Sequence, residues 1–149
     1  MQGNRAAVES TSKQNYITIR DSSVSGQEPD INALATKSTN SAAVMVWNYH
    51  DKNDLTVPLT SVSVIIKGLP QQRVLLTQYI IDQEHSDTFT AWKKMGSPKE
   101  LTGKEYKALE AAGQLEEISS PKYITLVNGE VKINFDLQRQ GVTLLKVTW

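Results

Sequence analysis

One stretch constrains the fold more than any other. Ala42 to Asp51 reads AAVMVWNYHD and is the longest unbroken apolar run in the chain. In a β-strand successive side chains point to opposite sides, so Met45, Trp47 and Tyr49 share one face and the small apolar residues between them share the other. One face can line a sandwich core, and the second needs a cover of its own. The run therefore predicts a central strand whose second face meets a helix, a loop or a neighbouring domain.

Length and charge exclude several classes of protein. The chain has 149 residues, enough for one domain with a real core, whereas a (β/α)8 barrel typically needs about 250. Lysine plus arginine and aspartate plus glutamate both number 16, so no basic field attracts nucleic acid or anionic lipid. No apolar run approaches the roughly 18 residues of a membrane helix. We therefore expect neither nucleic acid nor a membrane as a partner.

Two absences narrow the chemistry and the targeting. The chain has no cysteine, which excludes disulfides, thiol nucleophiles and thiolate metal sites but leaves the redox compartment open. Met1 to Gln14 is polar and lacks the apolar segment of a secretory signal. We interpret residues 1–15 as a lead-in from a missing N-terminal domain, and residues 16–149 as the folded domain.

Alternating or two-sided apolar runs predict strands along most of that domain. The expected strands are Tyr16–Arg20, Ile31–Thr36, Ala42–Tyr49, Leu59–Lys67, Arg73–Ile81, Tyr123–Val127, Val131–Leu137 and Val142–Trp149. The strand at 73–81 is apolar on both sides, like the one at 42–49, so both should lie centrally. The polar turn at 37–41 predicts a hairpin, and so does Asn128-Gly129, since both of its positions tolerate a positive φ.

The stretch from Asp82 to Pro121 departs from this rhythm and is far longer than the usual hairpin loop of about two to five residues. Thr102 and Glu105 form a capping box, and Gly113 suits a left-handed stop, which together predict one helix of about ten residues. The fold class we expect is all-β: an antiparallel β-sandwich of about eight strands with one helix in a long insertion at about 82–121. Loops this long usually cover or bind something.

The densest polar cluster opens this insertion and consists of Asp82, Glu84, His85, Ser86 and Asp87. Carboxylates with an imidazole can bind a metal or transfer protons, but neighbouring loop positions do not by themselves converge on one point. We interpret the cluster as a solvated loop whose side chains cap their own backbone, and assign no catalytic residue, metal ligand or cofactor. His50, beside Asp51 at a strand end, is interpreted as a turn residue.

Carbohydrate chemistry needs either paired carboxylates or exposed aromatic rings. No two acidic residues sit where the sequence predicts a strand-end cleft, so no acid and nucleophile are assigned. Trp47, Tyr49, Trp92 and Trp149 are candidates for a sugar-stacking platform. Trp47 lies in the middle of a strand and is interpreted as core or interface packing. Trp92 lies in the insertion and is retained as the functional aromatic.

Four segments carry a family resemblance: VMVWNYHD, IKGLP, RVLLTQYIIDQEHSDTFTAWKKMGSP and RQGVTLLKVTW. They resemble the C-terminal β-sandwich region of glycoside hydrolase family 39, the β-xylosidase and α-L-iduronidase family, and are more similar to its bacterial xylosidase-like members. The resemblance extends over nearly the whole chain. It implies a sandwich that packs on a (β/α)8 barrel, and because that barrel carries both catalytic glutamates, no residue here inherits a catalytic role.

The resemblance implies a docking role on the barrel of the same parent polypeptide. We expect the insertion to reach the barrel and border its substrate cleft through Glu84, His85, Ser86, Asp87 and Trp92. The other interface candidates are Trp47, Tyr49 and Tyr106. The alternatives are a free-standing carbohydrate-binding module that binds xylo-oligosaccharides through exposed aromatics, and a hydrolase in its own right. The parent's sugar, the cell compartment and the oligomeric state stay open.

Overall fold

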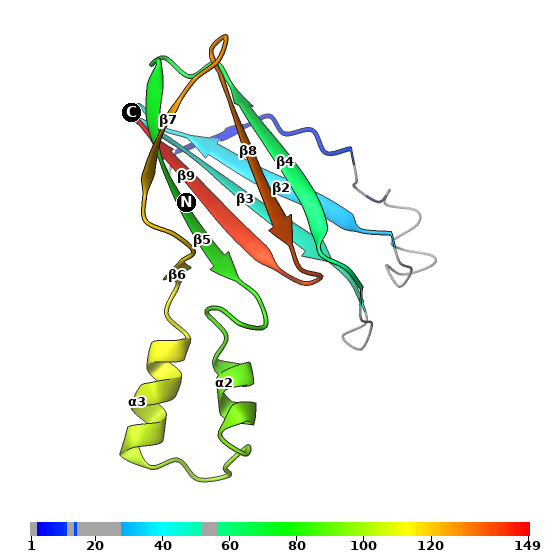
Figure 1. The fold of residues 1–149 in the computed structure, drawn as a ribbon, viewed down its shortest axis with the longest axis vertical. Coiled ribbons are helices and arrows are strands. Elements are labelled where there is room, and N and C mark those ends of the chain that lie inside the picture. The colour runs from blue at the N-terminus through cyan, green and yellow to red at the C-terminus, as the bar shows by residue number, and fades with distance from the viewer. Residues whose placement is uncertain (1–2, 12–13, 15–27, 52–56) are drawn as a thin grey trace.

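The computed structural model describes residues 3–11, 14, 28–51 and 57–149, so the strand expected at 16–20 lies outside the described residues. Two packed sheets form a sandwich, and a helical hairpin projects from one end of it (Figure 1). The elements in chain order are β1 (Asn4–Ala6), β2 (Asp30–Lys37), β3 (Ser41–Tyr49), β4 (Thr60–Lys67), β5 (Arg73–Ile81), α2 (Thr88–Lys94), α3 (Gly103–Ala112), β6 (Glu116–Glu117), β7 (Lys122–Thr125), β8 (Glu130–Leu137) and β9 (Val142–Thr148).

The larger sheet, sheet A, has the order β1-β2-β3-β9-β5-β6 within the described chain, and β7 also pairs with β5. The smaller sheet, sheet B, pairs β4 with β8, and every pairing is antiparallel. β3 and β5 both lie inside sheet A, as their two-sided apolar patterns predict. The hairpin expected between 31–36 and 42–49 is confirmed as β2 and β3. The all-β sandwich is therefore confirmed.

The core lies between the two sheets, and long strands such as β3 and β8 contribute about every second side chain to it. From β3 it takes Ala42, Val44 and Val46, which are buried, while Met45 and Trp47 point the other way. From β8 it takes the apolar residues that alternate with exposed polar ones, beginning with Val131 and Ile133. From β9 it takes Leu145 and Val147, both fully buried. The face of β3 that carries Ala42, Val44 and Val46 thus lines the core, and the face that carries Met45 and Trp47 stays outside it.

The Asn128-Gly129 turn forms with positive φ at both residues, 54° and 76°, but the strand hairpin expected around it is wrong. Only one bridge, Val127 to Glu130, joins the two sides of the turn. Beyond it β7 pairs with β5 in sheet A, and β8 pairs with β4 in sheet B. The turn therefore carries the chain from one sheet to the other.

The insertion contains two helices, so the expectation of a single helix is wrong. α3 begins at the predicted capping box, in which the Thr102 hydroxyl accepts from the Glu105 amide and the Glu105 carboxylate accepts from the Thr102 amide. Gly113 ends α3 with a φ of −86°, so the left-handed stop is wrong. α2 follows Asp87, whose carboxylate accepts from the backbone amides of Phe89 and Thr90. α2 is only seven residues long and buries none of them.

Candidate functional site

The first part of the candidate site is the outer face of sheet A, the face turned away from sheet B. Residues in register across antiparallel strands share a face, so the strand pairings define its side chains row by row. One row is Leu34, Met45, Leu144 and Tyr79, across β2, β3, β9 and β5. The next row is Asn32, Trp47, Val142 and Ile81 across the same strands. Together the rows make an apolar outer face that crosses four strands.

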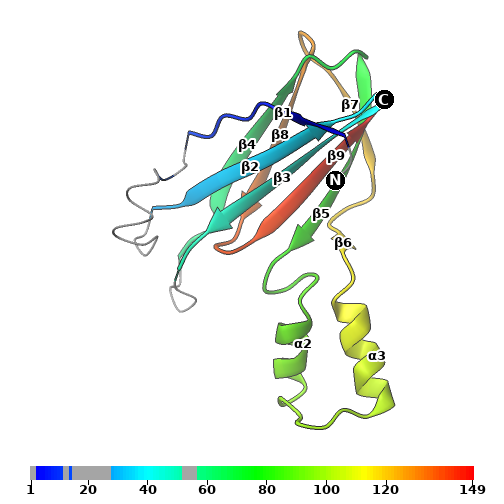
Figure 2. The same ribbon diagram turned by 180° about the vertical axis from the view of Figure 1, so that it is seen from behind.

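This outer face is only partly shielded from solvent. Met45, Trp47 and Leu144 are half-buried, and Ile81 is 44% exposed. Figures 1 and 2 show both helices beyond the end of the sandwich rather than over sheet A. Exposed apolar patches of this kind often mark interaction surfaces. The sequence therefore correctly predicts that the second face of β3 is apolar and outside the core.

Trp47 and Tyr49, two of the interface candidates, both lie on this outer face of β3. Tyr49 is 45% exposed, and its hydroxyl donates to the Asp51 carboxylate at 2.6 Å. That hydrogen bond raises the pKa of Tyr49, because removing the phenolic proton would place two negative charges together. Trp47 is half-buried between Asn32 and Val142 of the flanking strands.

The second part of the site belongs to the helical hairpin, residues 82–117, which we call the arm. It is the base of the arm, where residues 82–87 leave the sandwich and Glu116 and Glu117 return to it. Ile81 ends β5 in the same row as Trp47, two strands away, which is about 10 Å. The next residue, Asp82, begins the arm. The fold thus brings the arm's base and Trp47 to the same end of sheet A, although these two groups were predicted from separate stretches.

The polar cluster at the base mainly caps its own backbone, as we interpret from the sequence. The Asp82 carboxylate accepts from the backbone amides of Glu84 and His85, each at 2.8 Å. It also contacts the His85 ring nitrogen Nδ1 at 2.8 Å. This hydrogen bond is the main reason that the pKa of His85 is raised above 6.5, and nearby negative charge adds to it. Within the described residues, no group of three or more acidic or histidine side chains could hold a metal ion.

Ser86 joins the two ends of the arm. Its hydroxyl donates to the Ile80 carbonyl at 2.7 Å and accepts from the Glu116 amide at 2.9 Å. Ser86 itself has a φ of 55°, in the left-handed region. One side chain therefore connects the end of β5 to the start of β6.

Trp92 lies on α2 and is half-buried rather than fully displayed. Its indole nitrogen donates to the Pro98 carbonyl at 3.0 Å, and its ring stacks on Phe89 with centroids 5.8 Å apart. The Lys93 ammonium lies 4.3 Å from the centre of the same Phe89 ring, which is 58% exposed. Both aromatic rings are thus engaged by their own helix and the turn after it.

Tyr106 lies on α3, apart from Trp47 and Tyr49, and is 61% exposed. It belongs to the arm and not to the outer face of sheet A. The structure therefore divides the predicted interface residues between two surfaces. His50 directly follows the end of β3, where the sequence placed it, and is buried, and its backbone carbonyl accepts from the Gln140 side chain.

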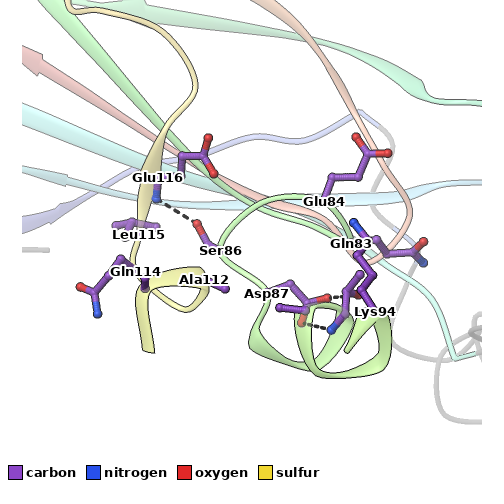
Figure 3. A pocket seen from close by; sticks show the side chains of 12 residues that line it. Gln83, Glu84, Ser86, Asp87, Lys94, Ala112, Gln114, Leu115 and Glu116 are labelled. Atoms are coloured by element: carbon purple, nitrogen blue, oxygen red, sulfur yellow. Dashed lines mark hydrogen bonds between the residues drawn. The ribbon is translucent and has the colours of Figure 1, made fainter. Parts of the chain in front are cut away.

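A pocket of about 340 Å³ lies between the base and the two helices (Figure 3). The residues that line it include the small Ala91, Ala111 and Ala112 and the charged Glu84 and Lys94. The lining therefore offers side chains of both charges, which suits a polar contact. No helix in the described chain is long and apolar enough to cross a bilayer.

Several outer-face residues were not among the sequence-predicted candidates, notably Leu34, Leu144, Tyr79 and Ile81. The usable signal was the two-sided apolar pattern of 73–81 and of VTLLKVTW at the end of the chain. Both strands have large apolar residues on each face. The pattern does not give the order of the strands, and it is this order that places these residues beside Met45.

Comparison with known proteins identifies the fold. No protein-family model matches the chain, and no curated protein does. The chain is similar to the GH39 enzyme from Xanthomonas axonopodis pv. citri (TM-score 0.67, 19% identity, 78% of this chain and 26% of that one). It is also similar to a monomeric β-xylosidase from Caulobacter crescentus CB15 (TM-score 0.62, 19% identity, 78% of this chain and 26% of that one). A bacterial orthologue of human α-L-iduronidase matches as well (TM-score 0.58, 14% identity, 82% of this chain and 22% of that one).

These likenesses show that the chain has the fold of one part of such glycosidases. The chain spans only about a quarter of the length of the enzymes it matches. The remaining three quarters of those enzymes have no counterpart in these residues.

Proposed function

We propose that this chain is the non-catalytic C-terminal β-sandwich domain of a family 39 glycoside hydrolase. Its parent is a β-xylosidase-like enzyme that acts on xylan-derived oligosaccharides. In this proposal the sandwich packs on the parent's (β/α)8 catalytic barrel, which carries both catalytic glutamates. The arm borders the substrate cleft. The chain by itself turns over no glycoside.

The single observation that carries the proposal is the outer face of sheet A. A sheet whose two faces are both apolar needs a layer on each side. Sheet B covers the inner face, while the side chains of Met45, Trp47, Leu144 and Ile81 remain half-buried or exposed. A domain interface within one polypeptide typically buries about 600 to 1,500 Å² and is a natural cover for such a face.

The partial match to the solved enzymes supports the same proposal. A fold that recurs as about a quarter of larger glycosidases fits a domain that works beside another. The identity of 19% or less carries no residue roles, so the parent's activity and sugar remain part of the proposal.

The arm is assigned to the cleft border because it starts at the end of the outer face. If the barrel lies on that face, Glu84, His85, Ser86 and Asp87 at the arm's base lie nearest the junction of the two domains. Glu84 and Lys94, which line the pocket, supply the polar groups that such a border needs. Trp92 contributes by holding α2 against the turn at Pro98.

A charge placed in the proposed interface tests the docking. In the full-length parent enzyme, Met45→Lys should lower the melting temperature and expose the inter-domain linker to protease. Ile65→Lys is the matched control, because Ile65 is 51% exposed on the outward side of β4 in the other sheet. If both variants behave alike, the outer face is not the docking surface.

A second comparison tests the cleft border. His85→Ala and Trp92→Ala in the full-length enzyme should lower kcat/KM on aryl xylosides. Lys132→Ala, at an exposed position of β8, is the control and should not. Unchanged kinetics and unchanged thermal stability in both variants would remove the arm from the cleft.

The same chain in isolation separates the alternatives. Titration with xylo-oligosaccharides while following tryptophan fluorescence should give no saturable change, since the Trp92 ring is half-buried, stacks on Phe89 and donates its indole N–H to the Pro98 carbonyl. Saturable binding would favour a free-standing carbohydrate-binding module. Turnover of nitrophenyl xyloside above the buffer blank would instead make this chain a hydrolase.

A further inference from the structure

Among the described residues, the arm joins the sandwich at its base. Of the ten residues of α3 only Leu109 is buried, and α2 buries none. The helices hold each other, for example through the Thr88 hydroxyl, which donates to the Leu109 carbonyl at 3.3 Å. In both views the helices project beyond the end of the sheets (Figures 1 and 2). The direction of the arm therefore depends on its base.

The chain passes through the base twice, once as it leaves β5 and once as it returns in β6, and a few hydrogen bonds hold these two crossings. On the outgoing side, the Asp82 amide donates to the His85 carbonyl at 3.1 Å, which closes a tight turn. On the returning side, Glu116 and Glu117 pair with Ile80 and Tyr79 over two residues only. Figure 3 shows Ser86 and Glu116 joined across the gap between these crossings.

His85 is the titratable cation of this base and lies among carboxylates. Its ring nitrogen Nδ1 is 2.8 Å from the Asp82 carboxylate, whose side chain is only 5% exposed. The other charges acting on the ring are Glu84 of the same turn and Glu116 of β6. Glu116 belongs to the returning crossing, so a protonated His85 attracts both sides of the base at once.

We propose that the Asp82–His85 pair is a pH-responsive hinge, which fixes the direction of the arm while His85 is protonated and loosens it when His85 is neutral. The neutral ring can still donate one hydrogen bond to the Asp82 carboxylate, but it loses the ion-pair attraction to that carboxylate and the attraction to Glu84 and Glu116.

The direction of the effect follows from linkage. The pKa of His85 is raised in the folded protein, so its protonated form is the one that the base stabilises. This stabilisation is complete below 6.5, the ordinary value, and is lost as the pH rises through the raised pKa. The arm is therefore fixed in mildly acidic solution and more variable in alkaline solution.

The absence of native cysteine allows two spin labels to be placed without interference. Glu110→Cys labels the exposed side of α3, and Lys132→Cys labels exposed β8. The distance distribution between the labels should be narrow at about pH 5.5 and broader at about pH 8.5. Its transition midpoint should lie above 6.5. A distribution with the same width at both values overturns the proposal.

Two variants and a control label pair separate a hinge from a merely structural base. His85→Gln should abolish the dependence on pH, and a pH response that persists in this variant overturns the proposal. Glu116→Gln should move the midpoint to lower pH, because it removes a charge that favours the protonated ring. A label pair at Lys132→Cys and Lys146→Cys stays within the sandwich and should not respond. All measurements use this chain alone, so their outcome is independent of the proposed docking on a barrel.

Discussion

The hydroxyl oxygen of Thr88 lies 2.5 Å from the position that a Cβ atom on Gly113 would occupy. Thr88 is the first residue of α2, and Gly113 directly follows the last residue of α3. The same hydroxyl donates to Leu109 in the last turn of α3. The two helices of the arm therefore meet where a glycine is needed for space and not for a left-handed backbone.

Gly113→Ala should loosen the arm. The added methyl group must push Thr88 away from α3, and overpacking of this kind typically costs about 1–3 kcal/mol. Amide hydrogen exchange in α2 and α3 should become faster while the sandwich is unaffected. Gly103→Ala is the control, because nothing lies within 4 Å of its new Cβ and alanine favours the helix. Equal exchange in the two variants would contradict the close contact.

Thr102→Ala should weaken the start of α3. The substitution removes the hydroxyl that accepts from the Glu105 amide and donates to the Glu105 carboxylate. Loss of such a cap typically costs about 1 kcal/mol. Faster amide exchange in the first turn of α3 is the expected readout. Lys107→Ala, on the exposed side of α3, should leave that exchange unchanged.

Ser86→Gly should detach the returning crossing of the arm. Glycine keeps the positive φ but removes the hydroxyl that bridges Ile80 and Glu116, and a lost hydrogen bond costs roughly 0.5–1.5 kcal/mol. The amides of Glu116 and Ile118 should exchange faster. Ser97→Gly tests the backbone effect alone, since Ser97 has the same φ of 55°. A similar loss of protection in both variants would assign the effect to glycine itself.

The isolated chain should expose apolar surface at the outer face of sheet A. We expect it to bind a hydrophobic fluorescent dye and to self-associate as concentration rises. Met45→Lys should reduce both signals, because it places a charge in the centre of that face. Ile65→Lys removes an equally apolar side chain from sheet B and should change them less. Light scattering and dye fluorescence provide the measurement.

Acid should release α2 from its cap. The pKa of Asp87 is lowered below 3.8, chiefly because the Thr90 hydroxyl and the backbone amides of Thr90 and Phe89 donate to the carboxylate. A lowered pKa means that this stabilisation is present above 3.8 and disappears as the pH falls through the folded value. Trp92 fluorescence should report the change. Asp87→Asn should remove this acid transition, and a transition of unchanged size would contradict its assignment to Asp87.

The sequence by itself determined the elements whose signals act over a few residues. The hydrogen bonds of the Thr102 and Glu105 capping box join residues three positions apart, so α3 begins where predicted. The alternation of Val131 and Ile133 with polar residues selects the inner face of β8 for the same local reason. Asp87 caps α2 through residues two and three positions away, but a helix of seven residues is too short for more than the single apolar pair Phe89 and Trp92.

Only the tertiary structure decided which strands meet. Asn128-Gly129 makes the turn that its residues predict, yet β7 and β8 leave it for different sheets because each finds its partner far away in sequence. The apolar second face of β3 was readable, but the row that joins Trp47 through Val142 to Ile81 exists only because β9 lies between β3 and β5. Strand order minimises the free energy of whole faces buried against distant segments, and no short stretch of sequence contains that information.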